Sequence, residues 1–166
     1  MQLKHFDVKS SAASITFAAS TSVHPIRSRG RVSGWVDACV VDDQFAESQT
    51  LRGSLEVPLS GLSSGNPLID REMKRRVDAV LHPVITATIE ETLAIDGNGA
   101  TITGTIEFLG ASTLVEGDIT LLPGPILVGT GEFDVTWWGL KPPRMLMVRV
   151  NPIVTVEIEA PLTEPP

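Results

Sequence analysis

The sequence is poor in cysteine and histidine, the residues from which disulfide frameworks and many metal sites are built. It contains one cysteine, Cys39, which excludes an internal disulfide and a cysteine-rich zinc cage. Its three histidines, His5, His24 and His82, lie far apart, and no two have the short spacing of a metal-binding motif. Gly129-Thr130-Gly131 lacks the strand-turn-helix context of a phosphate-binding loop. We therefore expect no metal site and no cofactor.

Positive charge and long apolar runs are also scarce. The 13 Lys and Arg residues face 20 Asp and Glu, so the net charge of -7 argues against nucleic-acid binding. No stretch approaches the roughly 18–20 apolar residues of a membrane helix. Residues 1–22 lack the apolar core of a signal peptide, which favours a cytoplasmic protein. A length of 166 residues with 42% hydrophobic residues is typical of one globular domain spanning residues 1–166.

Alternation of apolar and polar residues, in contrast, is abundant. In 101–108 and again in 132–137 every second residue is apolar or glycine. A period of two, sustained over many segments, predicts sheets with one apolar and one polar face. The turn Asp96-Gly97-Asn98-Gly99 between two such segments predicts a hairpin. About eight strands are expected, the last one split or bulged at Asn151-Pro152: 12–19, 31–41, 48–59, 83–93, 101–109, 114–122, 127–137 and 145–160.

One segment has helical spacing instead. Apolar residues recur there every three or four positions, at Ile69, Met73, Val77 and Val80. Asn66 is a good N-cap, and His82-Pro83 is a good stop signal. The pattern predicts a short amphipathic helix over 67–81. Because eight antiparallel strands leave no free edges only when they close, we predict a mainly all-β fold: a single antiparallel barrel with one short helix.

Several short motifs occur along the chain in a characteristic order. They are His24 with Ser28-Arg29-Gly30-Arg31-Val32, Leu55-Glu56-Val57-Pro58-Leu59 with Ser64-Gly65-Asn66, Asp70 and Met73 before His82-Pro83, Thr103-Gly104-Thr105-Ile106-Glu107-Phe108-Leu109-Gly110, and the run from Phe133 to Gly139-Leu140. In this order they resemble the YceI-like family of lipocalin-like, polyisoprenoid-binding barrels. The resemblance covers nearly the whole chain. It implies a lipocalin-like barrel that binds a long apolar molecule.

The resemblance and the alternation together imply a set of binding residues. Apolar side chains pointing into the barrel would contact the ligand: Ile15, Phe17, Val36, Leu55, Val57, Ile85, Ile106, Phe108, Phe133, Val135 and Trp137. Trp138 would point to the opposite face and lie at the barrel mouth. Three cations of the predicted helix, Arg71, Lys74 and Arg75, would flank the same mouth and meet an anionic head group or membrane surface.

Three functions remain open at this point. The first is a non-catalytic carrier that sequesters a polyisoprenoid or another lipid-like chain. The second is a cofactor-independent enzyme acting on an apolar substrate in the same barrel, and the third is a structural or interaction module with a filled core. The carboxylate pairs Asp42-Asp43 and Glu90-Glu91 do not suggest acid–base catalysis, because adjacent residues on a strand point to opposite faces. The resemblance and the stretch from Trp138 to Leu140 make a homodimer plausible.

Overall fold

Strands dominate the structure, a computed structural model that describes residues 2–141, 144–145 and 148–166. The strands of the first half are β1 (Lys4–Val8), β2 (Ser14–Thr21), β3 (Ile26–Arg31), β4 (Ser33–Ala38), β5 (Val40–Val41), β6 (Gln44–Phe45) and β7 (Arg52–Pro58). After β7 come the 3-10 helix η1 (Leu59–Gly61) and the helix α1 (Pro67–Arg76). The second half contains β8 (Val84–Asp96), β9 (Gly99–Phe108), β10 (Ala111–Leu122), β11 (Ile126–Asp134), the 3-10 helix η2 (Val135–Trp138), β12 (Arg144–Met145) and β13 (Val148–Thr163).

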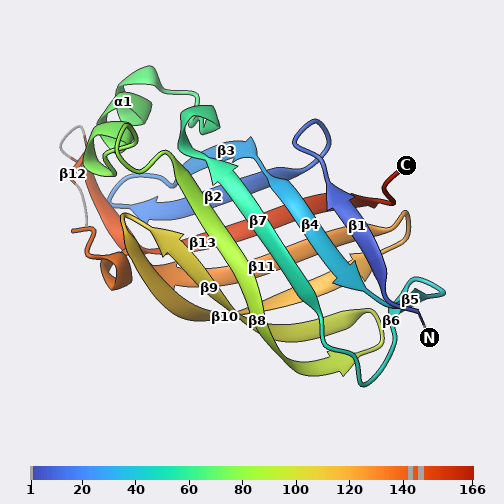
Figure 1. Cartoon of the computed structure of the whole chain (residues 1–166). Coiled ribbons are helices and arrows are strands. Elements are labelled where there is room, and N and C mark those ends of the chain that lie inside the picture. The colour runs from blue at the N-terminus through green and yellow to red at the C-terminus, as the bar shows by residue number, and fades with distance from the viewer. Residues whose placement is uncertain (1, 142–143, 146–147) are drawn as a thin grey trace.

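The strands form a closed antiparallel barrel of 8 strands, as the sequence predicted. Neighbours follow the order β1-β4-β7-β8-β9-β10-β11-β13 (Figure 1). The ring closes where β13 pairs with β1, through Asp7↔Thr163 and Val8↔Leu162. The wall therefore has no free edge along these strands. No helix in the described part of the chain is long and apolar enough to cross a membrane.

The wall is completed differently at the end where α1 lies. There β2 pairs with β13, and β3 pairs with β2, but no described residue of β3 belongs to a ladder with β7. Instead, Arg29 and Ser63 exchange two backbone hydrogen bonds of 2.9 Å, which attach β3 to the loop between η1 and α1. At this end, therefore, η1 and its following loop fill the space between two strands.

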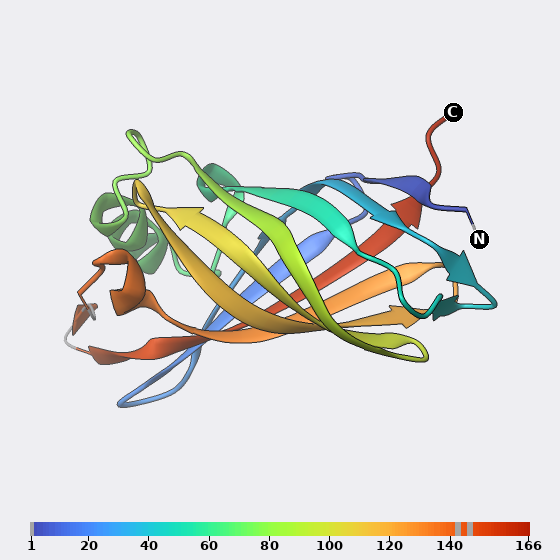
Figure 2. The ribbon, with the colours of Figure 1, turned by 60° about the horizontal axis from the view of Figure 1, so that its bottom comes forward.

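The opposite end of the barrel is filled by side chains. Figures 1 and 2 place α1 and β12 at one end and the two termini at the other, where Figure 1 also shows the β5–β6 hairpin. Phe45 of that hairpin is buried, and Leu51 and Leu121 are almost completely covered. The Gln49 side chain donates to the carbonyls of Cys39 and Ala46 and accepts from the Cys39 N–H, which fixes the chain around the hairpin. This end is a packed core rather than an opening.

Several predicted strand boundaries were wrong. The single strand expected at 31–41 is divided at Val32, because the chain changes partners there: β3 pairs with β2 and β4 pairs with β1. The same expected strand is interrupted again at Cys39, between β4 and β5, and strands β1, β3 and β6 were not expected. The predicted irregularity at Asn151-Pro152 is confirmed as a register shift between Val150 and Val154 in the pairing with β2, although β13 itself is continuous.

The helix is confirmed, but it is shorter than predicted. The Asn66 side chain caps it by accepting hydrogen bonds from the N–H groups of Leu68 and Ile69. It ends at Arg76 rather than at residue 81, because Asp78 adopts a left-handed φ of 47°. The N–H groups of Leu81 and His82 then bond back to the Asp78 carbonyl. The residues after Arg76 thus form turns, which carry the chain from the helix to β8.

Candidate ligand-binding cavity

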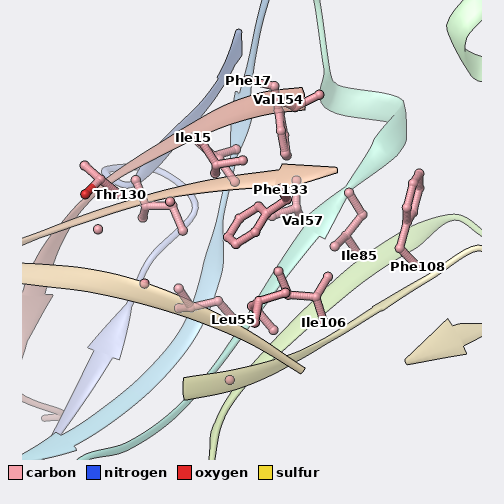
Figure 3. Close-up of a pocket in the computed structure, with 18 of the residues that line it drawn as sticks. Ile15, Phe17, Leu55, Val57, Ile85, Ile106, Phe108, Thr130, Phe133 and Val154 are labelled. Atoms are coloured by element: carbon pink, nitrogen blue, oxygen red, sulfur yellow. The ribbon is translucent and has the colours of Figure 1, made fainter. Parts of the chain in front are cut away.

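The barrel contains an apolar cavity at its α1 end. The cavity has a volume of about 310 Å³, which lies at the lower end of the usual range for small-molecule sites. Inward-facing side chains of the barrel strands form its wall (Figure 3). Met73 of α1 and Val77 just after it, together with Leu59 and Leu62, cover the side where the strands do not pair. The helix and η1 therefore act as part of the cavity wall.

The exposure of the wall residues shows that this part of the interior is open. Phe17, Leu55, Ile85 and Phe133 point inward (Figure 3) yet are only half-buried, although they pack against the core. Side chains at the closed end, such as Leu121, have no exposed surface. Because inward-facing residues can be exposed only to an internal space, the barrel is filled at one end and hollow at the other. A completely filled barrel, the third alternative above, does not describe the α1 half.

The structure brings together all but one of the residues expected to bind the ligand. The cavity wall includes Ile15, Phe17, Val36, Leu55, Val57, Ile85, Ile106, Phe108, Phe133 and Val135. Most of them follow directly from the pleat, since alternate residues of a strand face the same side. Contact between these residues and a ligand stays a prediction.

Trp137 is the exception, and its predicted inward orientation was wrong. The strand expected over 127–137 ends at Asp134, whose Oδ1 accepts hydrogen bonds from the N–H and Oγ1 of Thr136 and caps η2. In the 3-10 helix, residues three apart share a side, so the alternation of two no longer applies. As a result Val135 and Trp138 line the cavity, whereas Trp137 is 52% exposed.

Trp138 was expected at the mouth but lies inside. It is 7% exposed, and its Nε1 donates a hydrogen bond of 2.9 Å to the Ile106 carbonyl. Phe108 and Phe133 pack against it in T-shaped contacts, each with a ring-centroid distance of 6.4 Å. Two sequence signals could have shown this: the Asp134-Val135-Thr136 cap and Gly139, which ends η2 with a φ of 82°.

The three cations predicted at the mouth all lie on α1, beside the cavity. Arg71 and Arg75 are exposed, and Lys74 Nζ donates to the Ser60 carbonyl at 3.4 Å. Arg75 donates two hydrogen bonds to Glu72, of 2.6 and 3.1 Å. This hydrogen bonding lowers the pKa of Glu72 and raises the pKa of Arg75. The structure thus places the cations at the open end, without a partner that identifies their role.

Other wall residues were missed by the sequence analysis. Val154, Val156 and Ile158 of β13 continue the same alternation and could have been found from it. Leu59 continues the alternation of Leu55 and Val57 and could also have been found from it. Leu62 could not, because it follows η1 in an irregular segment. Its position depends on the bridge between Arg29 and Ser63, which is a tertiary contact.

The wall offers little chemistry for catalysis. Among its described residues the one titratable side chain is Asp118, which is exposed and accepts a hydrogen bond of 3.1 Å from Thr101 Oγ1. No group of three or more His, Cys, Asp and Glu residues in the described chain could hold a metal ion. The polar residue that is buried in the wall is Ser28, at 4% exposure.

Fold and site together define a closed antiparallel barrel with a preformed apolar cavity. The sequence matches the family model described as the YceI-like domain over residues 6–162. The chain therefore belongs to the YceI-like domain family, as its motifs suggested. No curated protein matches it in sequence.

Solved structures of low sequence identity share the fold. BcnA of Burkholderia cenocepacia is similar with a TM-score of 0.76 and 12% identity, covering 93% of this chain and 98% of BcnA. A polyisoprenoid binding domain of Saccharophagus degradans, implicated in plant cell wall breakdown, has a TM-score of 0.68 and 12% identity, covering 99% and 100%. The YceI protein of Campylobacter jejuni has a TM-score of 0.61 and 14% identity, covering 81% and 84%. At these identities the likeness shows the fold alone.

Proposed function

We propose that the protein is a non-catalytic carrier that sequesters a long apolar molecule, a polyisoprenoid or a similar lipid-like chain, in its barrel. The observation that carries this proposal is the cavity of about 310 Å³ with a wall that is almost entirely apolar. Transfer of each CH₂ group from water into such a space contributes about 0.8 kcal/mol. A preformed cavity adds to the affinity because little has to be ordered on binding. The polyisoprenoid-binding name of the relative from Saccharophagus degradans supports the same ligand class.

The cavity supports binding better than catalysis. An enzyme without a cofactor would need a titratable group beside its substrate. The acidic residue of the described wall, Asp118, has an exposed side chain that bonds to Thr101 instead. Family membership is consistent with a binding protein as well. The cytoplasmic location and the homodimer stay predictions.

The ligand would enter through the α1 end, from an anionic membrane surface. The three most exposed large apolar side chains of the described residues, Val80, Leu81 and Val23, lie in loops at this end. The β2–β3 loop, which carries Val23, is joined to β13 by a hydrogen bond from the Ser22 N–H to the Arg149 carbonyl. Lys141 and Arg149 are exposed near these loops, and the sequence from Gly139 to Asn151 has no acidic residue, although the chain carries -7 overall. Basic residues beside exposed apolar loops complement an anionic leaflet.

Native mass spectrometry of the protein purified from its own host tests the carrier function. We expect a co-purifying apolar molecule in the barrel. After delipidation, adding a long isoprenoid at a hundredfold excess over Kd should add about 2.7 kcal/mol of stability. This corresponds to a rise in Tm of roughly 5–10 °C. If no long apolar chain co-purifies or stabilises the protein, the carrier proposal is wrong. Turnover of the bound molecule would favour the enzyme alternative.

A cavity-blocking variant provides the matched test. Gly129 faces the cavity, and a Cβ there would meet only Ile119 and Ile158 atoms at 3.8 Å, an ordinary contact. Gly129→Leu should therefore place its side chain in the cavity and abolish ligand stabilisation. Val128→Leu adds bulk at the neighbouring position, which does not line the cavity, and should leave the stabilisation by the ligand unchanged. Equal ligand responses in the two variants would show that the ligand binds elsewhere.

A further inference from the structure

Ser28 is the buried polar residue in the described wall, which is otherwise almost entirely apolar. On β3, Arg27, Arg29 and Arg31 point outward and are exposed, whereas Ser28 faces inward and is 4% exposed. Its strand partner is Phe17, which also lines the cavity. In the described part of the chain no residue forms a hydrogen bond with the Ser28 hydroxyl. Because no fully buried side-chain oxygen of the described residues lacks a hydrogen-bond partner, the Ser28 hydroxyl is not sealed in the wall; it reaches the cavity and is available to a bound group.

The surroundings of Ser28 define what size of group could bond to it. Ser28 also lines a side pocket beneath α1, which shares Leu59, Leu62, Met73 and Val77 with the main cavity. The side pocket has a volume of only about 10 Å³, roughly the space for one water-sized group. Asp70 lies in this pocket, but its Oδ1 already accepts from the N–H and Oγ of Ser64. A single oxygen therefore fits in the side pocket beside Ser28, and a diphosphate does not fit there.

The scarcity of positive charge around the two spaces also argues against an anionic ligand group. The one cation lining either space, among the described residues, is Lys74, whose Nζ is engaged by the Ser60 carbonyl at 3.4 Å. A buried carboxylate or phosphate would need several donors or cations to compensate its lost hydration. A neutral oxygen needs one hydrogen bond, which a serine hydroxyl can donate or accept.

We infer that the cavity takes an apolar chain with one small uncharged oxygen group, an alcohol or a carbonyl, and that Ser28 hydrogen-bonds to this oxygen. The inference rests on the proposed carrier function and adds the chemical class and the orientation of the ligand. The oxygen lies next to β3 and α1, and the chain extends toward Ile106 and Phe133. Ser28 is thus a specificity-determining residue, and discrimination arises because a hydrocarbon leaves its hydroxyl unpaired.

Three ligands and two serine variants test this inference. Farnesol and farnesene share an apolar chain and differ in the hydroxyl, and displacement of a fluorescent apolar probe measures their Kd values. Ser28→Ala should weaken farnesol about three- to tenfold, as for one net hydrogen bond. It should leave farnesene binding unchanged. Ser33→Ala removes a half-buried hydroxyl of β4 that does not line the cavity, and it should affect neither ligand.

The outcomes separate this inference from the carrier function. If none of the ligands binds the parent protein, the carrier function itself fails. If farnesol and farnesene both bind and Ser28→Ala changes their two Kd values by the same factor, only the role of Ser28 is overturned. Tighter binding of farnesyl diphosphate than of farnesol, lost in Lys74→Ala, would also overturn it. The ligand-free Tm supplies a second measurement: Ser28→Ala should not lower it, and a clear decrease would mean that the hydroxyl already has a partner.

Discussion

The contrast between two adjacent tryptophans gives the sharpest test of the cavity geometry. Trp138 is 7% exposed, whereas Trp137 is 52% exposed. A tryptophan side chain buries roughly 200 Å², worth about 5 kcal/mol at 25 cal/mol per Å². Alanine keeps its Cβ, and the neighbours relax partly, so we expect Trp138→Ala to lower the free energy of unfolding by about 4 kcal/mol. Trp137→Ala should cost about 1 kcal/mol or less.

A milder variant separates the ring from its hydrogen bond. Trp138→Phe retains an aromatic ring between Phe108 and Phe133 but loses the bond from Nε1 to the Ile106 carbonyl. We expect a loss of about 1–2 kcal/mol, because an unmade hydrogen bond is added to a small loss of packing. This variant keeps the test informative if Trp138→Ala does not fold.

Urea unfolding followed by far-UV circular dichroism measures these free energies. Fluorescence gives an independent readout, since an apolar ligand should alter the emission of Trp138. The ligand-induced change should persist in Trp137→Ala and disappear in Trp138→Phe. A loss of stability in Trp137→Ala equal to or larger than that in Trp138→Ala would refute the placement of η2 and of the cavity wall beside it.

Two other predictions concern α1. Arg71→Glu with Lys74→Glu should reduce cosedimentation with vesicles of phosphatidylcholine and phosphatidylserine at least tenfold, because each basic residue near an anionic surface contributes about 1 kcal/mol. The same charge change at the closed end, Lys4→Glu with Arg52→Glu, should have little effect, and equal losses in both would contradict docking through the open end. The second prediction follows from the lowered pKa of Glu72, caused by its hydrogen bond from Arg75. The stabilising effect of this carboxylate should be complete above the pKa that glutamate has in the unfolded chain, and it should disappear as the pH falls through the lower pKa of the folded state. Urea unfolding should therefore show the parent more stable than Glu72→Gln at about pH 6, and this difference should shrink steadily as the pH is lowered; a difference that stays constant in acid would contradict the assignment.

Much of the barrel and its inner surface could be predicted from the sequence, because the strand pleat imposes a strict period. Once a segment is known to be a strand, alternation gives the residues that face inward. Ile15 and Ile106 were predicted in this way, and both line the cavity. The helix start was equally predictable, because Asn66 makes its capping bonds within four residues. These are local rules, so they need no knowledge of the fold.

The wrong predictions of side-chain orientation occurred where a strand ended and its alternation no longer applied. Trp137 and Trp138 exchanged their expected positions because the strand stops one residue before Val135. Asp42 and Asp43 both have positive φ, of 50° and 58°, and form the turn of the β5–β6 hairpin. That hairpin fills the closed end with Phe45, an outcome that depends on contacts across the whole barrel. An open or a filled interior is likewise decided by tertiary packing and cannot be deduced from alternation.

The position of β13 in the ring determines when the barrel can form during synthesis. It pairs with β11 on one edge and with β2 and β1 on the other, yet it is the last strand in the described chain. A nascent chain that ends before Val148 can form hairpins, but no described pairing then joins β11 to β2 or β1. Until β13 leaves the ribosome, the future cavity wall remains an apolar surface open to water and to other chains. The barrel can therefore close only once β13 is available, and its apolar inner face has to be shielded in the meantime.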